Sequence, residues 1–388
     1  MTNAPLARQR DASARHSPPR VRTARRAMTM PRAAGRHRQT NTLMPNAYIS
    51  GTGMYVPDEI VTNDDLRTKY GIDTTHEWVV QRTGIEQRRY APEGMAPSDL
   101  AVPATKQALE RAGLQARDLD MILFATLSPD MHFPGSGVFL QRKLGLLDGD
   151  SPRFVPAMDI RNQCSGFLYG LATATAMVQS GGCKHVLVVG AETHSAALDF
   201  TTRGRTVSSL FGDAAGVAIV SATDEDRGIR GWWLGADGRH AEALCMRIWD
   251  MTKRPFVPLD QGKDGPGVIQ PEILWPHMDG KVVFKNAVER MCQSIMQACW
   301  EKGVELADVD LFAFHQANMR INQYVANTMN IPESKLLHNI ERFGNTTAAT
   351  IPTLLAEAEH TGRLKRGMKV MMVAFGAGFT WGAALCDW

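Results

Sequence analysis

The sequence predicts an α/β protein built from two duplicated βαβ halves, because three observations agree. Residues 107–120 recur as residues 297–310 at an offset of 190, with Gln, Ala, Gly and two Asp positions in common. Residues 184–190 resemble residues 368–374 at an offset of 184. The matched segments come in the same order in both halves. This pattern indicates a duplicated supersecondary unit, with parallel sheets that are covered on both faces.

Each copy of the first repeat predicts a helix that leads into a buried strand. The helical pattern ends at Gly113 in one copy and at Gly303 in the other, where glycine suits a helix C-cap. A short loop then leads to the continuous apolar runs 121–125 and 311–314, as expected for strands covered on two faces. The second pair of matched runs predicts two more strands of the same kind.

Length and composition indicate a globular protein with a large core. The 388 residues are 44% apolar and 21% charged, and they are enough for two lobes. Six cysteines show no CxxC pair and no regular spacing, so neither a disulfide framework nor a zinc site is implied. No apolar run approaches the ~18 residues of a membrane span, and no secretory signal is evident. We therefore expect a cytoplasmic protein.

The net charge of +3 hides a basic N-terminal segment. Residues 1–44 carry ten arginines and one acid, whereas the rest of the chain has a net charge of −6. This segment lacks periodic apolar residues and is predicted to be disordered. It could be a nucleic-acid arm, a transit-type peptide or a surface anchor. A solvated tail, or a start assigned upstream of the true one at Met44, is favoured, because aromatics and a folded basic module are missing.

Cys164 is the first candidate for chemistry. It lies where the polar residues 161–163 give way to the apolar run 167–172, which predicts a thiol at the N-terminus of a buried helix. Amide N–H groups and the helix dipole at such a position favour thiolate over thiol. The alternative is a buried, inert cysteine.

Three later segments could supply partners for this thiol. His315 follows the predicted strand 311–314, and strand ends in parallel sheets are where reacting groups collect. Asn345 follows Gly344, and the glycine-rich turn 375–382 could bring backbone N–H groups close to a substrate. A core histidine, a helix N-cap and a tight turn are the ordinary alternatives for these three features.

The duplication relates these segments to Cys164. At the observed offsets, Cys164 corresponds to a position near residues 347–350. The helices that follow Cys164 and Asn345 are therefore predicted to be symmetry mates. They could face one another at the junction of the halves, where a shared site would lie.

Five motifs resemble β-ketoacyl-acyl-carrier-protein synthase III, a condensing enzyme of the thiolase superfamily. The resemblance runs from about residue 46 to the C-terminus, with poor agreement over residues 238–270. It implies a thiolase-like, five-layered αβαβα architecture with a first half at 45–222 and a second half at 223–388. The motifs are residues 73–85 (DTTHEWVVQRTGI), 211–216 (FGDAAG), 315–321 (HQANMRI), 344–349 (GNTTAA) and 378–382 (GFTWG).

The resemblance implies decarboxylative condensation. Cys164 would accept an acyl group from acyl-CoA, and the N–H groups of Cys164 and Ala377 would form the oxyanion hole. His315 and Asn345 would hydrogen-bond the carbonyl oxygen of a malonyl thioester and stabilise the enolate that forms as CO₂ leaves. Both side chains can donate without acting as a general base, which decarboxylation does not need. No metal and no cofactor beyond the CoA thioesters is implied.

The resemblance also implies the binding residues and partners. Arg320 would belong to the patch that meets malonyl-acyl carrier protein, malonyl-CoA being the other possible donor. Phe133 would cap the acyl pocket of a partner subunit, which implies a homodimer, and Met278 would line the edge of the acyl pocket. Without the motif context the arginines would be assigned to surface solvation, and no nucleic acid is expected. The expected CoA contacts are Trp78, Arg82, Arg203 and Asn318, which suit adenine stacking, phosphate pairing and pantetheine binding.

Departures from the family pattern keep other functions open. Residues 161–163 replace small residues, Ala377 replaces a glycine, and an insertion at about 240–275 is expected to reshape the acyl tunnel. One alternative is specialised acyl transfer or condensation in secondary metabolism with a non-malonyl acceptor. A cysteine hydrolase is a further alternative, although the protease signature around the cysteine is missing. A non-catalytic binding protein would not need all three polar side chains.

Overall fold

In the computed structural model of the protein, the described helices and strands run from Asn46 to Asp387. The structure describes residues 44–248, 250–253, 259–260, 268–269 and 271–388. The expectations for the basic segment 1–44 therefore lie almost wholly outside the described residues. Much of the insertion predicted at 240–275 lies outside them too.

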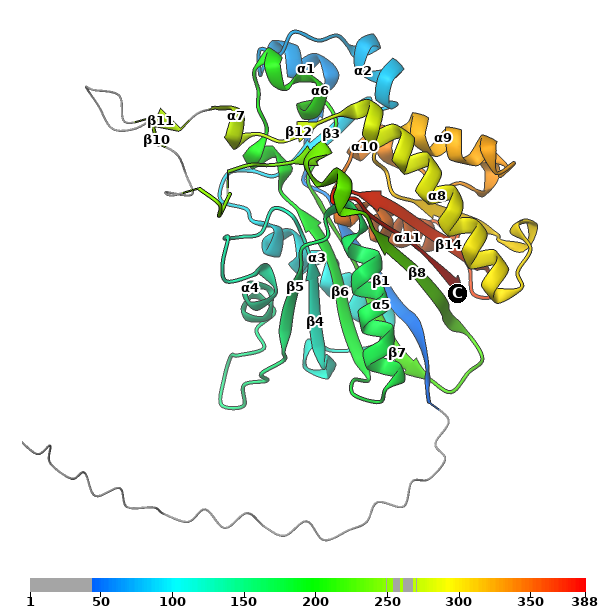
Figure 1. Ribbon diagram of the computed structural model, residues 1–388. Helices are drawn as coiled ribbons and strands as arrows, with labels where there is room; N and C mark the ends of the chain where they lie inside the picture. The colour runs from blue at the N-terminus through cyan, green and yellow to red at the C-terminus, as the bar shows by residue number, and fades with distance from the viewer. Residues whose placement is uncertain (1–43, 249, 254–258, 261–267, 270) are drawn as a thin grey trace, which may run out of the picture. The chain divides into compact units, whose positions relative to one another are not determined.

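The first sheet draws all of its strands from residues 46–223. Its order is β1-β7-β6-β4-β5, with β4 parallel to both β5 and β6 and with β7 antiparallel to β6 and β1 (Figure 1). Its strands are β1 (Asn46–Tyr55), β4 (Met121–Ala125), β5 (Ala157–Ile160), β6 (His185–Glu192) and β7 (Ala214–Thr223).

The second sheet repeats this plan with residues 228–387. Its order is β13-β14-β15-β8, with β13 parallel to β14 and the other two pairs antiparallel. The prediction of parallel strands is therefore confirmed for β4 with β6 and for β13 with β14, but it is wrong for each sheet as a whole, because both sheets are mixed. Only three residues separate β14 from β15, and such a short connection reverses the chain instead of allowing a parallel crossover. The strands are β8 (Gly228–Ala236), β13 (Leu311–Phe314), β14 (Lys369–Gly376) and β15 (Thr380–Asp387).

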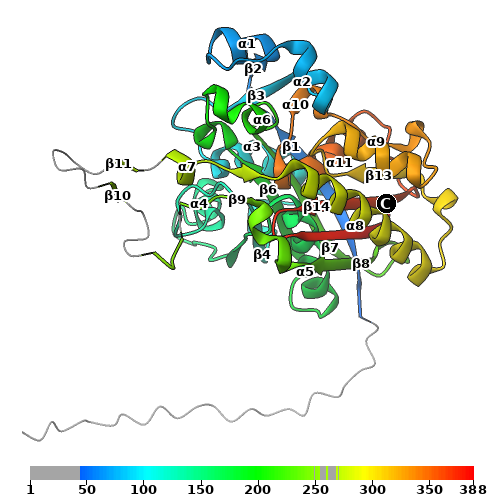
Figure 2. The same cartoon turned by 45° about the horizontal axis from the view of Figure 1, so that its top comes forward.

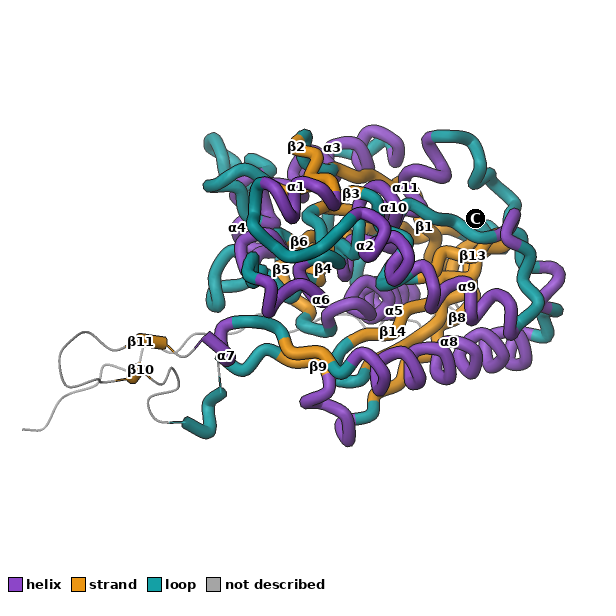
Figure 3. The backbone as a smooth tube through the Cα atoms, turned by 90° about the horizontal axis from the view of Figure 1, so that it is seen from above, coloured by secondary structure: helices purple, strands orange, loops and turns teal. Residues whose placement is uncertain are grey.

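Helices cover both sheets and fill the space between them. Three apolar clusters lie outside the first sheet, between the sheets and outside the second sheet, so that the layers alternate as αβαβα. Figure 3 shows α3 and α8 on opposite sides, with β1 and β14 between them. The helices are α3 (Pro97–Ala112) and α4 (Ser136–Lys143) outside, α5 (Gly166–Gln179) and α11 (Thr350–His360) in the middle, and α8 (Gly280–Lys302) and α9 (Met319–Thr328) on the far side.

The predicted repeat is confirmed at the level of elements. Strands β4 and β13 have the predicted bounds, and β6 and β14 begin one residue later than predicted. Gly113 and Gly303 both end their helices in the left-handed conformation, with φ of 65° and 61°. The same local signals therefore produce the same turn in both copies.

Smaller elements gather above the ends of the two sheets (Figures 1 and 2). The ends of the insertion meet there, since β9 pairs with β12. These elements are β2 (Glu59–Thr62), α1 (Asn63–Thr68), α2 (His76–Thr83), β3 (Gln87–Tyr90), α6 (Arg205–Ser208), β9 (Leu244–Cys245), α7 (Pro271–Leu274), β12 (His277–Met278) and α10 (Ile340–Phe343). Within the insertion, β10 (Leu259–Asp260) pairs with β11 (Val268–Ile269).

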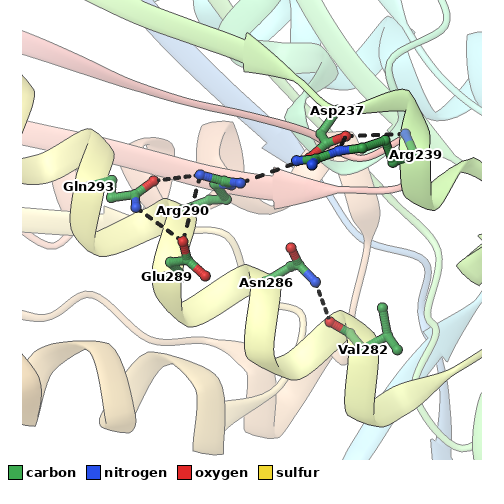
Figure 4. A network of polar contacts seen from close by, with 7 residues as sticks. All are labelled: Asp237, Arg239, Val282, Asn286, Glu289, Arg290 and Gln293. Atoms are coloured by element: carbon green, nitrogen blue, oxygen red, sulfur yellow. Dashed lines mark hydrogen bonds and ion pairs between the residues drawn. The ribbon is translucent and has the colours of Figure 1, made fainter.

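An ionic network joins the end of β8 to α8 (Figure 4). Asp237 pairs with Arg239 at 2.5 Å and lies 3.8 Å from Arg290 of α8. Arg290 also donates to Gln293 at 2.8 Å and stacks over the ring of Trp381 at 4.9 Å. These contacts hold α8, which lines the cavity described below, against the edge of the second sheet.

Candidate active site

Cys164, His315 and Asn345 line one cavity of about 130 Å³. The three side chains are nearly buried, with 8%, 2% and 4% of their surface exposed. Cys164 comes from the first half of the chain, and the other two residues come from the second half. The remaining lining is mainly apolar and includes Leu244, Met278, Phe284 and Phe375.

Cys164 lies in a 3₁₀ turn, Gln163–Ser165, that leads directly into α5. The matching turn Thr347–Ala349 leads into α11. Gln163 and Thr347 are related by the same offset of 184, and both have positive φ, at 44° and 50°. The predicted correspondence between Cys164 and the region of residues 347–350 is thus confirmed, with Ala348 in the equivalent position.

The start of α5 is pressed against β14 of the other half. A Cβ atom on Gly376 would lie 2.9 Å from Cβ of Cys164 and 3.1 Å from its backbone nitrogen, so only glycine fits there. Ala377 follows at once, and its φ is not among the positive values. Replacing the usual glycine by alanine therefore causes no backbone strain at this position.

Cys164 is a thiol in the free protein, contrary to the expectation of a thiolate. Burial raises the pKa of Cys164 to about 12, and the charge of Glu192 acts in the same direction. The backbone N–H groups of Cys164 and Ala377 both reach the sulfur and lower this pKa, but by less. Cys164 does lie at a helix start, as predicted. Desolvation of the sulfur nevertheless raises its pKa by more than the helix start lowers it.

Glu192, at the end of β6, is a buried carboxylate that sequence reasoning missed. Its oxygens accept from Oγ1 of Thr126 at 2.9 Å, Oγ of Ser128 at 2.6 Å, and the backbone nitrogens of Leu127 and Ser128 at 3.1 Å. Burial raises the pKa of Glu192 to about 7, against the effect of these donors. An acidic residue that closes an otherwise apolar strand was the signal available in the sequence.

His315 directly follows β13, at the strand end where it was predicted. Its Nδ1 lies 2.7 Å from Oγ1 of Thr350, while its Nε2 is buried and has no hydrogen-bond partner among the described residues. Burial lowers the pKa of His315 to about 3, so the ring is neutral. A core histidine would have both nitrogens satisfied. The unpartnered Nε2 belongs to a side chain that lines the cavity, so it is available to a ligand there.

Asn345 is fixed by three backbone contacts. Its N–H donates to the oxygen of Leu210 at 2.8 Å, and its own carbonyl accepts from Gly212 at 3.1 Å. Its Oδ1 accepts from the N–H of Thr347 at 2.9 Å, as in an Asx turn. Because Oδ1 is occupied, Nδ2 remains to donate to a ligand. The N-cap of the following turn is Thr346 and that of α11 is Ala349, so Asn345 is not the helix N-cap given as its ordinary alternative.

Three of the expected CoA contacts, Trp78, Arg82 and Arg203, are not part of the cavity lining. Trp78 on α2 has the guanidinium of Arg82 over its ring at 4.4 Å and that of Arg205 at 4.8 Å. Arg203 is exposed and pairs with Asp199 at 2.7 Å. Arg205 is thus a second arginine on the ring of Trp78, and sequence reasoning did not single it out.

The other predicted residues have different settings. Asn318 lines the cavity and donates through Nδ2 to the carbonyl of Arg82 at 3.0 Å, which joins α9 to α2. Met278 also lines the cavity, whereas Arg320 is exposed at the start of α9. Phe133 is 81% exposed and does not line the cavity of its own chain.

Two further observations concern the cysteines and the apolar character of the helices. All six cysteines are free. Among the helices of the described residues, none combines the length and apolar character that a membrane crossing requires.

Comparison with known proteins gives consistent matches. The family model for 3-oxoacyl-[acyl-carrier-protein] synthase III matches residues 158–238, and the model for the C-terminal part of the same enzyme matches residues 299–388. The chain is similar to the β-ketoacyl-[acyl-carrier-protein] synthase III 1 of Halalkalibacterium halodurans, with 38% identity over 345 residues. That match covers 89% of this chain and 99% of the relative.

Two solved structures extend the comparison. The 3-oxoacyl-[acyl-carrier-protein] synthase III of Aquifex aeolicus has 36% identity and a TM-score of 0.77, covering 88% of this chain and 100% of that one. The priming β-ketosynthase of the R1128 polyketide pathway has 30% identity and a TM-score of 0.77, covering 88% and 96%.

Proposed function

Because the chain belongs to the β-ketoacyl-acyl-carrier-protein synthase III family of acyltransferases, we propose that Cys164, His315 and Asn345 perform its reaction. Members of this family condense an acyl-CoA with malonyl-acyl carrier protein, with loss of CO₂, and so initiate fatty-acid or polyketide synthesis. The observation that carries the assignment is that these three side chains, from two halves of the chain, line one cavity.

The first step is acylation of Cys164. Its sulfur attacks the thioester carbonyl of an acyl-CoA, the bond from that carbon to the CoA sulfur breaks, and the thiol proton passes to the departing CoA. The N–H groups of Cys164 and Ala377 already converge on the sulfur, which supports their role as the oxyanion hole. A buried thiol suits this step, because water that would hydrolyse the acyl-enzyme is excluded.

The second step is decarboxylation of a malonyl thioester. Nε2–H of His315 and Nδ2–H of Asn345 donate to its carbonyl oxygen. The bond between the carboxylate carbon and the α-carbon breaks, CO₂ leaves, and the electron pair forms an enolate. The α-carbon then attacks the acyl carbonyl on Cys164, and the sulfur departs as a thiolate. The neutral state of the His315 ring supports its role as a hydrogen-bond donor that is not consumed as an acid.

Five further residues are proposed to bind CoA or the acyl carrier protein. Trp78 and Arg82 would hold the adenine and phosphates of CoA with Arg203, and Asn318 would contact the pantetheine. Arg320, exposed beside the cavity, would meet the acidic carrier protein. The exposed Phe133 supports a homodimer in which it caps the partner's acyl pocket, whose edge in each chain includes Met278. The free cysteines support a cytoplasmic setting.

A second candidate function is favoured by one observation. The priming ketosynthase of the R1128 pathway shares 30% identity and the same fold. This match supports a condensation that primes polyketide synthesis as the second candidate, whereas a non-malonyl acceptor is supported only by the sequence departures at residues 161–163 and the insertion. Both ends of the insertion contribute to the cavity, through Leu244 and Met278, which supports an effect of the insertion on acyl-chain choice.

Intact-mass spectrometry after incubation with short, long and branched acyl-CoAs tests the assignment. We expect one acyl adduct on the wild-type protein, no adduct on Cys164→Ala, and an unchanged adduct on Cys386→Ala, which removes an equally buried cysteine. Adding malonyl-acyl carrier protein should then discharge the adduct and release CO₂. An adduct that persists on Cys164→Ala would refute the nucleophile, and discharge without CO₂ would favour the alternative acceptor.

A further inference from the structure

The hydroxyl of Thr350 is the only described group within hydrogen-bonding distance of the His315 ring. It lies on the first residue of α11, and the Oγ1 to Nδ1 distance is 2.7 Å. Both side chains are almost completely buried, at 1% and 2% exposure, so water does not compete for this contact. Thr350 therefore determines which nitrogen of His315 carries the ring proton.

The Thr350 hydroxyl has one proton and two acceptors. Nδ1 of His315 lies at 2.7 Å, and the carbonyl oxygen of Thr347 lies at 3.0 Å. If the proton goes to Nδ1, the ring must carry its own proton on Nε2. If it goes to the Thr347 carbonyl, Nδ1 must be the protonated nitrogen, and Nε2 then offers only a lone pair. The carbonyl of Thr347 already accepts the backbone N–H of Thr350, so the hydroxyl proton is not required there and is free to go to Nδ1.

The two positions of the ring proton would affect a ligand in the cavity differently. Nε2 is buried and unpartnered among the described residues, and it belongs to a side chain that lines the cavity with Asn345. A bare lone pair at Nε2 would repel a thioester or enolate oxygen, whereas an N–H would stabilise it. We propose that Thr350 is a positioning residue that donates to Nδ1 of His315 and so holds the Nε2–H donor ready for the malonyl carbonyl oxygen.

The turn Thr347–Ala349, which leads into α11, also orients the second hydrogen-bond donor, the side-chain amide of Asn345. The N–H of Thr347 binds Oδ1 of Asn345 at 2.9 Å, which leaves the amide Nδ2 to donate. Oγ1 of Thr347 contacts Nε2 of the buried His194 at 2.6 Å, and this anchors the turn. The residues that open α11 thus orient both hydrogen-bond donors of the condensation step. This inference rests on the proposed function, because it assigns Thr350 to that step.

Three variants of the full-length protein test the proposal. Thr350→Val removes the hydroxyl with little change of volume, and Thr350→Ser restores it. Thr353→Val is the matched control, since Thr353 is equally buried on the same helix and, within the part of the chain that the structure describes, its hydroxyl binds only the carbonyl of Thr350, at 2.9 Å. Acyl-adduct formation on Cys164 and CO₂ release from malonyl-acyl carrier protein are measured separately for each.

We expect Thr350→Val to acylate normally and to release CO₂ roughly 10- to 100-fold more slowly, the usual range for loss of a group that orients a functional histidine. Thr350→Ser should recover most of the rate, and Thr353→Val should keep it. Nitrogen-15 NMR of labelled histidine supplies a second readout. His315, identified by its absence in His315→Ala, should be protonated at Nε2 in the wild type and at a mixture of both nitrogens in Thr350→Val.

Three results would overturn the proposal: an Nδ1-protonated ring in the wild type, undiminished CO₂ release by Thr350→Val, or equal losses in Thr350→Val and Thr353→Val. Failure of the proposed function is distinguishable from these. In that case the wild-type protein would release no CO₂ from malonyl-acyl carrier protein, while the NMR measurement would still report the tautomer of His315.

Discussion

At the scale of single residues, burial is the dominant influence on the chemistry of the site. The same desolvation holds Cys164 as a thiol and His315 as a neutral ring. Neither state would be ideal for a nucleophile activated by a general base. Both suit a site in which the sulfur carries an acyl group and the ring donates a hydrogen bond.

The raised pKa of Cys164 predicts how the free protein reacts with alkylating agents. The pKa is about 12, so the thiolate fraction should rise about tenfold per pH unit throughout the accessible range. Alkylation of Cys164 by iodoacetamide, followed by peptide mass spectrometry from pH 6.5 to 9.5, should therefore accelerate without a plateau. Cys164→Ala supplies the background from the other cysteines. A plateau below pH 8 would mean that the thiolate is already formed.

His194 provides a pH prediction that does not involve a catalytic group. Burial lowers the pKa of His194 to about 3, whereas an unfolded histidine titrates near 6.5. The unfolded chain therefore binds a proton below pH 6.5 that the folded protein does not. This contribution to stability is complete above pH 6.5 and is lost as the pH falls, by about 1.4 kcal/mol per pH unit.

The comparison with His194→Gln isolates this contribution. Between pH 6 and 4.5 the free energy of unfolding should fall more steeply for the wild type than for the variant. Glu192 and Asp213, whose pKa values are raised by burial, act in the opposite direction but are present in both proteins. Equal slopes in urea unfolding would show that His194 is protonated in the folded state.

At the scale of elements, the site depends on how closely each middle helix approaches a strand of the other half. The start of α5 meets β14 at Gly376, and the start of α11 meets β6 at Gly190. A Cβ atom on Gly190 would lie 2.2 Å from the carbonyl oxygen of Ala348, which is backbone and cannot move aside. Both contacts fix the turns that carry the functional groups.

We therefore expect Gly190→Ala to be strongly destabilising. Overpacking of this kind costs typically 1–3 kcal/mol, and a backbone clash should reach about 3 kcal/mol. Thermal unfolding measures the loss, and CO₂ release should fall as well, because Ala348 belongs to the turn that opens α11. Gly238→Ala is the control, since nothing lies within 4 Å of its added Cβ and Gly238 is not part of the cavity lining. Equal stability of the two variants would contradict the predicted clash.

The elements also explain what could be predicted from the sequence. Strands β4 and β13 were predicted with correct bounds, because burial on two faces leaves a continuous apolar run between turn signals. Parallel pairing was predicted correctly for β4 with β6 and for β13 with β14, but not for each whole sheet, because the direction of the other strands depends on the connections and not on composition. The role of Thr350 could not be predicted, since it arises only when α11 brings residue 350 beside residue 315. A buried helix that opens with several threonines was the only hint.

At the scale of the whole molecule, the catalytic unit is residues 44–388. This unit contains both sheets, all three apolar layers and every residue of the cavity. The match to the Halalkalibacterium relative likewise spans 345 residues and covers 99% of that protein. The ten arginines of the N-terminal segment lie outside it.

A protein that begins at Met44 should therefore keep the acyl adduct, the rate of CO₂ release and the thermal midpoint. Its net charge should change from +3 to −6, which ion-exchange elution will report. Binding to duplex DNA and to anionic vesicles, measured for both proteins, distinguishes the possible roles of the segment. Tight binding by the full chain alone would contradict a merely solvated tail. Loss of activity on truncation would contradict the assignment of the catalytic unit.

The start of α5 packs against β14 of the second half, and the turn before α11 packs against β6 of the first half. This arrangement determines when the site can form during protein synthesis. Cys164 emerges from the ribosome long before His315, Asn345 and Ala377, which follow it by 151, 181 and 213 residues. The first sheet can form while the second half is still being translated. The nascent chain therefore exposes its thiol before the proposed hydrogen-bond donors have been made. The cavity is complete only when β14 has been made and packs against the start of α5 at Gly376.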